Sequence, residues 1–587
     1  MLISTFQPKL DNLEIRITNE ETTEKVATVI LSFLKKEKVN FIFGMHGGYT
    51  VGMGEELHNF PEIQFIHCQH EGGAAFMADG YAKASGKFGV VLTTAGPSLT
   101  NAFTGIISSF ADGIPILLIS GAVPHSKALI GAIQDTASFG MDVASSFKEA
   151  VRFHADIHNK DTFLQYFREA IRYLYRGKKG PVFLNIESDI FSQEVTHNFK
   201  YLRHSNNKFF DAESTDFVLD VLKKSHNAVI VAGNGVKLSK AQDELEVFAN
   251  LLKIPVIVTP KGKSGFNNES ELFLGSFGAG SNIIPDEYLK QEPIETIIAL
   301  GTSFNEYSSD TWSKLIPKTY RIIQIDIDPY IIGRLFANTY GVHGDIKTTL
   351  NYLNDRIKKS ELDFEHLNSL PIIKKYRNNF ANTINPELYT SDKVPIKTPR
   401  LLKDVYDAFC DHIVNIFNDN GSCIFWLNHY MKFRKGWNFY SSLGFSSMGY
   451  AFSAAIGGAL GDPSKVTIAF AGDGAAIMNG NELKTASEYD VPVFFIVLND
   501  SRLGIVYHST KAIYGRESVG TEFKKPIDFV KFAESLGVEA YRIEKPGEIN
   551  RDFINELIKK GKPILFECMV DRDEMAPYAG RINQVKK

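Results

Sequence analysis

Residues 471–504 read AGDGAAIMNGNELKTASEYDVPVFFIVLNDSRLG, and this stretch decides how the fold is interpreted. An apolar run leads into it, and Gly472 and Gly474 allow a tight turn around Asp473. A helical stretch follows, then the apolar run VPVFFIVL, and then Asp500. If the two runs are neighbouring parallel strands, both acids lie at one sheet edge, where open α/β sheets bind their ligands.

Two carboxylates at that edge predict a metal site. With backbone carbonyls and water they form an oxygen cage that suits Mg²⁺. Such an ion holds a diphosphate, and the helix N-terminus after Gly474 would help to neutralise it. A lone Gly-Asp-Gly is more often only a turn. However, the second acid follows 27 positions later, directly after another strand, and this spacing favours the metal site.

Over the rest of the chain, the same alternation of strands and helices occurs in three successive blocks. Continuous apolar runs with Gly-rich ends alternate with helical stretches, which is typical of parallel sheets covered on both faces. We therefore predict an α/β fold with three doubly wound parallel-sheet domains. The apolar runs are 89–96, 114–121, 181–187, 227–235, 296–302, 320–328, 466–474, 491–500 and 563–570.

The runs also suggest domain boundaries. We expect a charged, irregular linker between the second and third domains, crossing the surface. The predicted segments are an N-terminal tail (1–20), a first domain (21–192), a middle domain (205–355), the linker (356–397) and a last domain (398–587).

Composition narrows the class of protein. The 587 residues carry a net charge of −4, so no basic excess suggests nucleic acid. The four cysteines have no CxxC or zinc spacing, which fits a reduced, cytoplasmic setting. We expect no signal peptide and no membrane span, because the first residues soon turn polar and no apolar run is long enough. The sequence contains no GxGxxG motif and no P-loop, which disfavours a generic nucleotide-binding protein.

The Gly-Asp-Gly turn, with this spacing to an Asn-Asp pair, resembles the signature of thiamine diphosphate (ThDP) enzymes. The similarity is to the acetohydroxyacid (acetolactate) synthase, pyruvate oxidase and benzaldehyde lyase group. It covers nearly the whole chain, in the order pyrimidine-binding, middle and diphosphate-binding domain. It implies ThDP and Mg²⁺ as cofactors, with Asp473, Asp500 and the main-chain carbonyl of Arg502 as metal ligands. The family usually has Asn at the position of Asp500, so the extra charge is a departure.

The resemblance implies further cofactor contacts in the last domain. LGFSSMGYAFSAAIGGA (443–459) is similar to a family run that places Met448 as an apolar wedge under the cofactor, although Met also fills cores well. NHYM (428–431) resembles the family's QHQM, which implies diphosphate contacts for Asn428 and His429. The remaining implied cofactor-binding residues are Gly472, Gly474, Ala475, Leu503, Gly504 and Ile505.

A glutamate stands at the start of a small-residue helix in the first domain. CQHEGGAAFMADGY (68–81) begins a run that is similar to the family's catalytic-glutamate helix, so Glu71 is implied as catalytic and cofactor-binding. The cofactor itself forms a carbanion at C2. A carboxyl hydrogen-bonded to N1′ of its aminopyrimidine helps that ring to take the proton. The alternative is a structural Glu71 paired with His70.

In this family the glutamate and the metal site that serve one cofactor come from different subunits. The resemblance therefore implies a homodimer or homotetramer with active sites at the subunit interface. From charge and hydropathy we expect no membrane or nucleic-acid partner.

Three features bear on the reaction. GAIQDTASFG (131–140) lacks the His-His pair of simple decarboxylases, and Gln134 resembles a family glutamine that contacts the intermediate or acceptor. The alternative for Gln134 is an ordinary loop residue. Tyr49 stands where benzaldehyde lyase has an active-site His, or is a helix-start aromatic. Tyr507 and His508 replace a Trp-containing region of true acetohydroxyacid synthases and are candidate substrate contacts.

The resemblance thus implies a ThDP- and Mg²⁺-dependent lyase or ligase. It would cleave a 2-oxo acid such as pyruvate and transfer the acyl carbanion to a carbonyl acceptor, in an acetolactate synthase-like carboligation. A non-oxidative 2-oxo acid decarboxylase and a C–C hydrolase remain alternatives, as does a non-catalytic ThDP-binding protein. Tyr307 lies where true synthases have an arginine that handles the acceptor carboxylate. We expect no FAD, because IDID (325–328) is present but the family's usual GMHG and RFDDR contacts of the middle domain are not.

Overall fold

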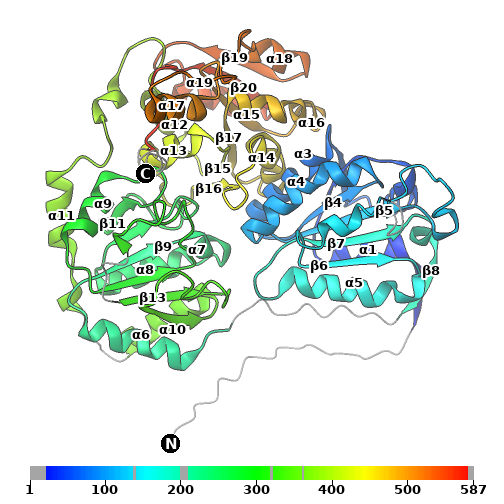
Figure 1. Cartoon of the computed structure of the whole chain (residues 1–587), viewed down its shortest axis with the longest axis horizontal. Helices are drawn as coiled ribbons and strands as arrows, with labels where there is room; N and C mark the ends of the chain where they lie inside the picture. Colours follow the sequence, from blue (N-terminus) through cyan, green and yellow to red (C-terminus); the bar gives the residue numbers. More distant parts are fainter. Residues whose placement is uncertain (1–20, 137–140, 198–208, 317–320, 360–362, 579–587) are drawn as a thin grey trace, which may run out of the picture.

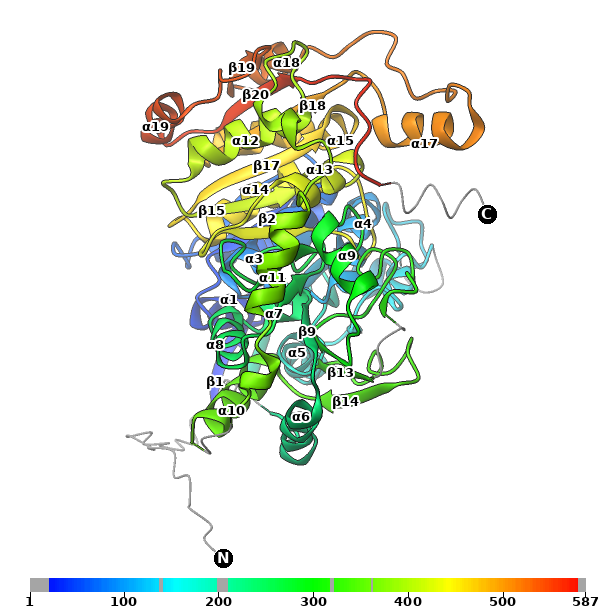
Figure 2. The same cartoon turned by 90° about the vertical axis from the view of Figure 1, so that its left-hand side faces the viewer.

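The computed structural model describes residues 21–136, 141–197, 209–316, 321–359 and 363–578 (Figure 1). It contains three six-stranded parallel sheets, which confirms the predicted α/β class. Each sheet with its helices is called a unit here. Both views place the third unit across the other two (Figures 1 and 2). The predicted N-terminal tail lies outside the described residues. Within the described residues, no helix combines the length and apolarity needed to cross a bilayer.

The first unit has the strand order β3-β2-β4-β5-β7-β6. The antiparallel pair β1 and β8 joins the two ends of the unit. Its strands are β1 (Thr22–Lys25), β2 (Phe41–Gly44), β3 (Gln64–His67), β4 (Gly89–Thr93), β5 (Ile116–Ala122), β6 (Phe153–Ile157), β7 (Val182–Glu187) and β8 (Glu194–His197). Its helices are α1 (Val26–Lys36), α2 (Val51–Leu57), α3 (Glu71–Ser85), α4 (Pro97–Asp112) and α5 (Lys160–Tyr175).

The second unit has the strand order β11-β10-β9-β12-β13-β14. Its strands are β9 (Ala228–Ala232), β10 (Val256–Val258), β11 (Phe273–Ser276), β12 (Thr296–Leu300), β13 (Arg321–Asp326) and β14 (Thr339–His343). Its helices are α6 (Ala212–Lys224), α7 (Asn234–Leu238), α8 (Gln242–Leu252), α9 (Ile283–Gln291) and α10 (Ile346–Lys359).

The stretch predicted to be an irregular linker contains a helix. This helix, α11 (Leu370–Asn379), buries Ile373 and Tyr376 in the core of the second unit. The charged residues around them hide the apolar spacing in the sequence. The linker therefore packs on the second unit over part of its length, and α10 extends to Lys359, past the predicted domain boundary.

The third unit has the strand order β16-β15-β17-β18-β20-β19. Its strands are β15 (Val414–Asn418), β16 (Asn438–Ser441), β17 (Val466–Gly472), β18 (Val493–Asn499), β19 (Glu539–Ile543) and β20 (Ile564–Met569). Its helices are α12 (Thr398–Phe409), α13 (Ser422–Tyr430), α14 (Tyr450–Gly461), α15 (Asp473–Met478), α16 (Leu483–Glu488), α17 (Gly504–Tyr514), α18 (Phe529–Ser535) and α19 (Arg551–Lys560). Strands β17 and β18 are parallel neighbours, as predicted.

Helices α3 and α14 hold the first and third units together at backbone distance. A Cβ atom added at Gly80 would lie 1.8 Å from the carbonyl oxygen of Ala454, and one at Gly457 would lie 1.8 Å from that of Met77. Only glycine fits at these two crossings. The small residues of both helices therefore serve a contact between units, and a single hydrophobic core extends through both.

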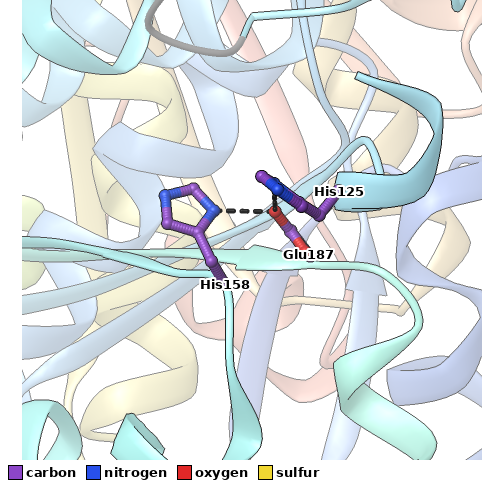
Figure 3. A group of neighbouring side chains, drawn as sticks. All are labelled: His125, His158 and Glu187. Atoms are coloured by element: carbon purple, nitrogen blue, oxygen red, sulfur yellow. Dashed lines mark hydrogen bonds and ion pairs between the residues drawn. The ribbon is translucent and has the colours of Figure 1, made fainter.

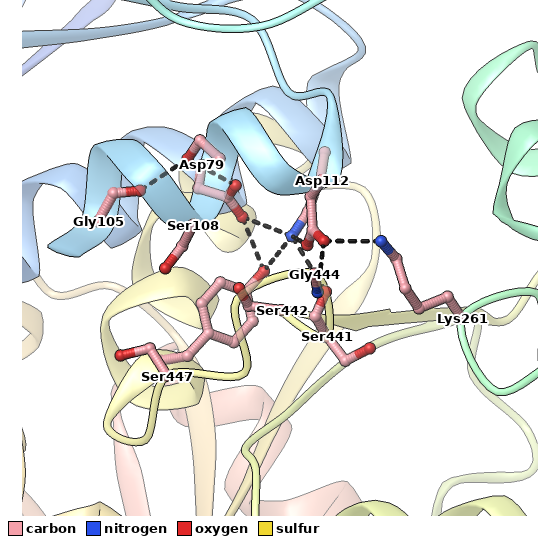
Figure 4. A network of polar contacts seen from close by, with 12 residues as sticks. Asp79, Gly105, Ser108, Asp112, Lys261, Ser441, Ser442, Gly444 and Ser447 are labelled. Carbon is pink, nitrogen blue, oxygen red and sulfur yellow. Dashed lines mark hydrogen bonds and ion pairs between the residues drawn. The ribbon is translucent and has the colours of Figure 1, made fainter. Parts of the chain in front are cut away.

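A buried polar network lies beside this contact (Figure 4). The Lys83 amine lies 2.7 Å from Asp79 and 3.2 Å from Asp112, both in the first unit. It also donates to the hydroxyl of Tyr450 in the third unit, at 3.0 Å. Lys261 of the second unit reaches Asp112 at 2.6 Å. One network thus joins all three units.

Candidate functional site

Asp473 and Asp500 lie at the carboxyl ends of two paired strands, β17 and β18. The Gly474 N–H donates to Asp473 Oδ1 at 2.6 Å, and the Arg502 N–H donates to Asp500 Oδ1 at 3.2 Å. Asp473 is 2% exposed, and its Oδ2 is buried without a hydrogen-bond partner among the described residues. An orphaned carboxylate oxygen of this kind fits a site built to hold a cation.

The raised pKa values of Asp473 and Asp500 also support a cation site. Burial raises the pKa of Asp473 to about 7, and the neighbouring Asp500 carboxylate contributes to the rise. Burial also raises the pKa of Asp500, to about 6. Two buried carboxyls that disfavour each other's charge are stabilised as anions by a bound divalent cation. The residues present therefore fit Mg²⁺.

Four other predicted residues lie close to the acid pair. A Cβ atom on Gly474 would lie 2.5 Å from Leu503 Cδ2 and 3.6 Å from Met448 Cε, so both side chains flank this glycine. A Cβ atom on Gly504 would lie 2.7 Å from Asp500 Oδ2. Glycine at both positions keeps the space beside the carboxylates open. Met448 is only half-buried, and its predicted contact with a cofactor stays a prediction.

The start of α13 lies at the same edge, and none of its residues was predicted to belong to the site. Ser422 Oγ lies 3.6 Å from the position of a Cβ on Gly504, and Cys423 Sγ lies 3.9 Å from that of a Cβ on Gly472. Burial raises the pKa of the Cys423 thiol, and the charges of Asp419, Asp500 and Asp473 add to this. The signal was present in NIFNDNGS (415–422), a strand followed by glycine and a helix start, as at Gly472.

Asn428 and His429 lie at the other end of α13, about 10 Å further along the helix axis. Asn428 Nδ2 donates to the carbonyl oxygen of Ala279 at 2.5 Å. His429 Nδ1 lies 2.6 Å from the carbonyl oxygen of Ser281, and its Nε2 accepts from the Ile384 N–H. Burial lowers the pKa of His429 to about 4. These hydrogen bonds join α13 to the second unit and to the linker, and none of them supports the predicted diphosphate contact.

Arg502, Tyr507 and His508 form a cluster beside the acid pair. The Arg502 guanidinium lies 4.1 Å from the centre of the Tyr507 ring. The Nε and Nη1 atoms of Arg502 are buried without a hydrogen-bond partner among the described residues. His508 Nε2 lies 3.1 Å from the carbonyl oxygen of Arg572, and burial lowers the pKa of His508. Substrate contacts of Tyr507 and His508 stay predictions.

Glu71 is the first residue of α3 and is 7% exposed. Its Oε2 accepts a hydrogen bond from Asn101 Nδ2 at 2.9 Å. His70 does not pair with it there, because His70 Nδ1 accepts from the Gly72 N–H at the helix start. Another acid lies close by. Glu482 of the third unit accepts from the His70 N–H at 2.9 Å, and burial, with a contribution from the Glu71 charge, raises the pKa of Glu482 to about 7.

Tyr49 and Gln134 meet at the same edge of the first sheet. Tyr49 follows β2, and its hydroxyl donates to the carbonyl oxygen of Ile133 at 2.6 Å. Gln134 has a backbone φ of 61°, and its Cβ lies 3.0 Å from the position of a Cβ on Gly96, before α4. Glu71, Tyr49 and Gln134 thus follow β3, β2 and β5 of one sheet. Apart from Asn428 and His429, the sequence-predicted residues form two clusters, the candidate half-sites, one on the first unit and one on the third.

A cavity of about 240 Å³ lies between the second and third units. Tyr307, Phe425 and Tyr578 supply aromatic walls, and Asp286 and Asp310 supply carboxyls. Burial raises the pKa of Asp286 to about 7 and also raises that of Asp310. The described residues that line this cavity include no lysine or arginine, so its chemistry is poorly suited to an anionic diphosphate.

Comparisons with known proteins agree with this division. Residues 24–142 match the family described as thiamine pyrophosphate enzyme, N-terminal TPP binding domain. Residues 215–353 match its central domain, and residues 419–568 its C-terminal TPP binding domain. Thiamine pyrophosphate (TPP) is the same compound as ThDP.

Similar curated proteins align over most of their length. A probable acetolactate synthase large subunit of Methanococcus aeolicus is 30% identical over 580 residues, covering 95% of this chain and 94% of that protein. The acetolactate synthase large subunit of Lactococcus lactis is 29% identical, covering 93% and 92%. The mitochondrial catalytic subunit of acetolactate synthase from Saccharomyces cerevisiae is 26% identical, covering 96% and 82%.

Proposed function

Because the chain belongs to the thiamine pyrophosphate enzyme family, we propose that it is a ThDP- and Mg²⁺-dependent carboligase acting on a 2-oxo acid. The donor would be pyruvate or a close analogue, and the acceptor a second carbonyl compound. The names of its relatives, at 26–30% identity, support an acetolactate synthase-like reaction. When bound, ThDP supplies the nucleophilic carbon that attacks the donor carbonyl.

The observation that carries this proposal is the orphaned, buried carboxylate oxygen at the edge of β17 and β18. Asp473 and Asp500 would hold the metal ion, together with the main-chain carbonyl of Arg502. Ser422 at the start of α13 would donate to the diphosphate, whose charge the helix N-terminus also favours. We propose Ser422 for this contact because Asn428 is engaged with the second unit.

Glu71 would act on the other end of the cofactor. Its burial beside Asn101 holds one carboxylate oxygen in place and leaves the other to exchange a proton with the pyrimidine ring. Within one chain, the carboxyl of the third unit that lies near the start of α3 is that of Glu482. The acid pair lies at the ends of β17 and β18, whereas Glu71 follows a strand of the first sheet. We propose that Glu71 serves the metal site of a second copy, which makes a homodimer the smallest working unit.

Gln134 and Tyr49 favour transfer over simple decarboxylation. Gln134 lies against Gly96 at the start of α4, and Tyr49 donates to the neighbouring Ile133 carbonyl, and both contacts support a role for the Gln134 amide at the first half-site. We propose that this amide orients the acceptor carbonyl by hydrogen bonding, with Tyr507 and His508 as tentative substrate contacts across the site. The acid-lined cavity supports the proposal that FAD is not a cofactor.

The test is product analysis on the full chain loaded with ThDP and Mg²⁺. Pyruvate is supplied alone and with an added aldehyde, and CO₂ and new acyloins are followed by mass spectrometry. We expect an acyloin or acetolactate with CO₂ release. Free acetaldehyde as the main product would instead support the decarboxylase, and no turnover of any 2-oxo acid or diketone would support a non-catalytic binding protein.

A further inference from the structure

Three side chains with metal-binding atoms converge on the first unit, outside both half-sites (Figure 3). His125 begins the 3-10 helix η2 (His125–Lys127), shortly after β5. His158 follows the last residue of β6, and Glu187 is the last residue of β7. Strands β5, β7 and β6 are consecutive in the sheet, so their carboxyl ends bring the three side chains together.

The distances between the donor atoms are close to those of a metal site. His158 Nδ1 lies 2.7 Å from Glu187 Oε1, and His125 Nδ1 lies 3.7 Å from the same oxygen. One ligand atom of each residue lies within 4.8 Å of both others. Ligands about 2.0–2.1 Å from a tetrahedral zinc ion are about 3.3 Å apart. Small side-chain rotations would therefore complete the geometry.

The negative charge of the buried Glu187 carboxylate also favours a bound cation. The Glu187 side chain is 7% exposed, and the ion-pair contacts described for it are with the two histidines, which carry charge only when protonated. A buried carboxylate without a full countercharge is costly. The His158 and His125 side chains are 57% and 81% exposed, so an ion can enter from solvent and can keep a water ligand.

We propose that His125, His158 and Glu187 bind one divalent cation of the zinc class. Two imidazoles and a carboxylate suit Zn²⁺, whereas Mg²⁺ prefers a set of oxygen ligands. This site would be separate from the acid pair of the third unit in both location and chemistry. Three protein ligands leave an open position for water or for a small anionic ligand.

The bound ion would attach the segment that contains Gln134 to the sheet of the first unit. His125 lies nine residues before Gln134 in the stretch that follows β5. His158 and Glu187 are anchored at the ends of the neighbouring strands β6 and β7. An ion bound to all three would fix the beginning of this stretch to the sheet, next to the turn in which Tyr49 contacts Ile133.

The test is a titration of the full chain after removal of metals, in excess Mg²⁺ and ThDP so that the acid pair is occupied. Zn²⁺ binding is followed by calorimetry, and Co²⁺ binding by visible absorption, which reports coordination number. We expect one equivalent of Zn²⁺ per chain in the micromolar range or tighter. His125→Ala, His158→Ala and Glu187→Gln should each weaken that equivalent by at least about tenfold.

His58→Ala is the matched control, because His58 is an exposed histidine of the same unit that is not part of the cluster. It should leave the titration unchanged, and circular dichroism checks that every variant is folded. Glu187→Gln preserves side-chain size, so its loss of binding cannot come from a cavity. Absence of the tight equivalent in wild type, or an equal loss in His58→Ala, would overturn the proposal. Zn²⁺ should also slow amide exchange over 123–136, and unchanged exchange would overturn the role in fixing this segment.

Discussion

At the scale of single residues, the burial of three acids determines the chemistry that we propose for them. Asp473 and Asp500 are acids that the fold forces together, and their raised pKa values express the cost of doing so without a cation. Glu71 is buried too, but against the amide of Asn101. In the proposed site, the same side-chain chemistry would thus serve metal binding in one unit and proton transfer in the other.

Glu71→Gln tests the proton-transfer role. The amide keeps the size of the side chain and can still hydrogen-bond N1′, but it cannot share a proton, so exchange of the C2 proton of bound ThDP should fall about 10²–10⁴-fold. Cofactor affinity should stay near wild type, because Asp473 and Asp500 provide the anchor. Quenched-flow exchange in D₂O read by NMR measures the rate, with Glu488→Gln, an exposed glutamate, as control. A wild-type rate would leave Glu71 only a structural role.

Asp473→Asn tests the metal site. The variant removes one of two carboxylates, so Mg²⁺-dependent ThDP binding should weaken by at least about 10–100-fold. In metal-free buffer it should unfold no earlier than wild type, because the repulsion between the buried acids is gone. Calorimetric binding and thermal unfolding give the two readouts, and Asp462→Asn, beyond the end of α14, is the control. Unchanged ThDP affinity would exclude Asp473 as a ligand.

The positions of the two acids could be predicted, because a strand end fixes the direction of the next residue. Asn428 could not be placed the same way. Its motif resembled a cofactor contact, but the helix starts at Ser422, and two turns separate its two ends. The residue at which α13 begins, after Gly421, decides which of its side chains lie near the acid pair. The role of Ser422 depends on a helix boundary, which local sequence determines poorly.

At the scale of elements, contacts between helices explain residues that local propensity does not. Gly80 lies inside α3, where glycine is unfavourable for a helix, yet the contact with α14 requires it. The longer central strands were predictable from their continuous apolar runs. Short strands such as β10, which has three residues and lies between β11 and β9, were not predicted, and neither was the helix α11 in the charged linker, because packing within the second unit defines both.

Gly80→Ala tests the contact between α3 and α14. Alanine would gain up to about 1 kcal/mol in helix propensity. However, its Cβ would lie 1.8 Å from a backbone oxygen that cannot rotate away, and overpacking of this kind costs about 1–3 kcal/mol or more. We therefore expect a net loss of stability and a lower thermal midpoint.

The control for this variant is Gly48→Ala, because a Cβ at Gly48 meets nothing within 4 Å. Its midpoint should stay near that of wild type. Differential scanning fluorimetry compares the two, and an unchanged midpoint for Gly80→Ala would show that the helices can separate at little cost.

At the scale of the whole molecule, buried lysines join the units. Lys263 of the second unit is 2% exposed and donates to Ser276 Oγ at 2.8 Å and to the carbonyl oxygen of Asn428, in the third unit, at 2.5 Å. Burial lowers the pKa of Lys263 to about 7. The contact between these units therefore depends on whether one amine carries a proton.

The pH dependence has a definite sign. The folded pKa of Lys263 is about 7 and the ordinary value is 10.5, so between these values the unfolded chain holds more protons than the folded chain. Stability from this group therefore rises with pH across that window, by up to about 1.4 kcal/mol per pH unit, and is lowest below pH 7. Lys263→Met removes the dependence and leaves a constant loss of two hydrogen bonds.

We expect the difference in thermal midpoint between wild type and Lys263→Met to grow in favour of wild type from pH 7 to pH 9. The exposed Lys290→Met is the control and should show a constant difference. Parallel midpoint curves for wild type and Lys263→Met would mean that the amine stays charged in the folded state.

The division of the proposed site between the first and third units has a genetic consequence. If Glu71 of one copy serves the acid pair of another, two inactive variants should rescue each other. A mixed dimer of Glu71→Gln and Asp473→Asn chains contains one site with both defects and one site with neither. Co-expression with two affinity tags, followed by tandem purification, should recover about half the wild-type activity per dimer. A chain that completed its site from its own residues would show no such complementation.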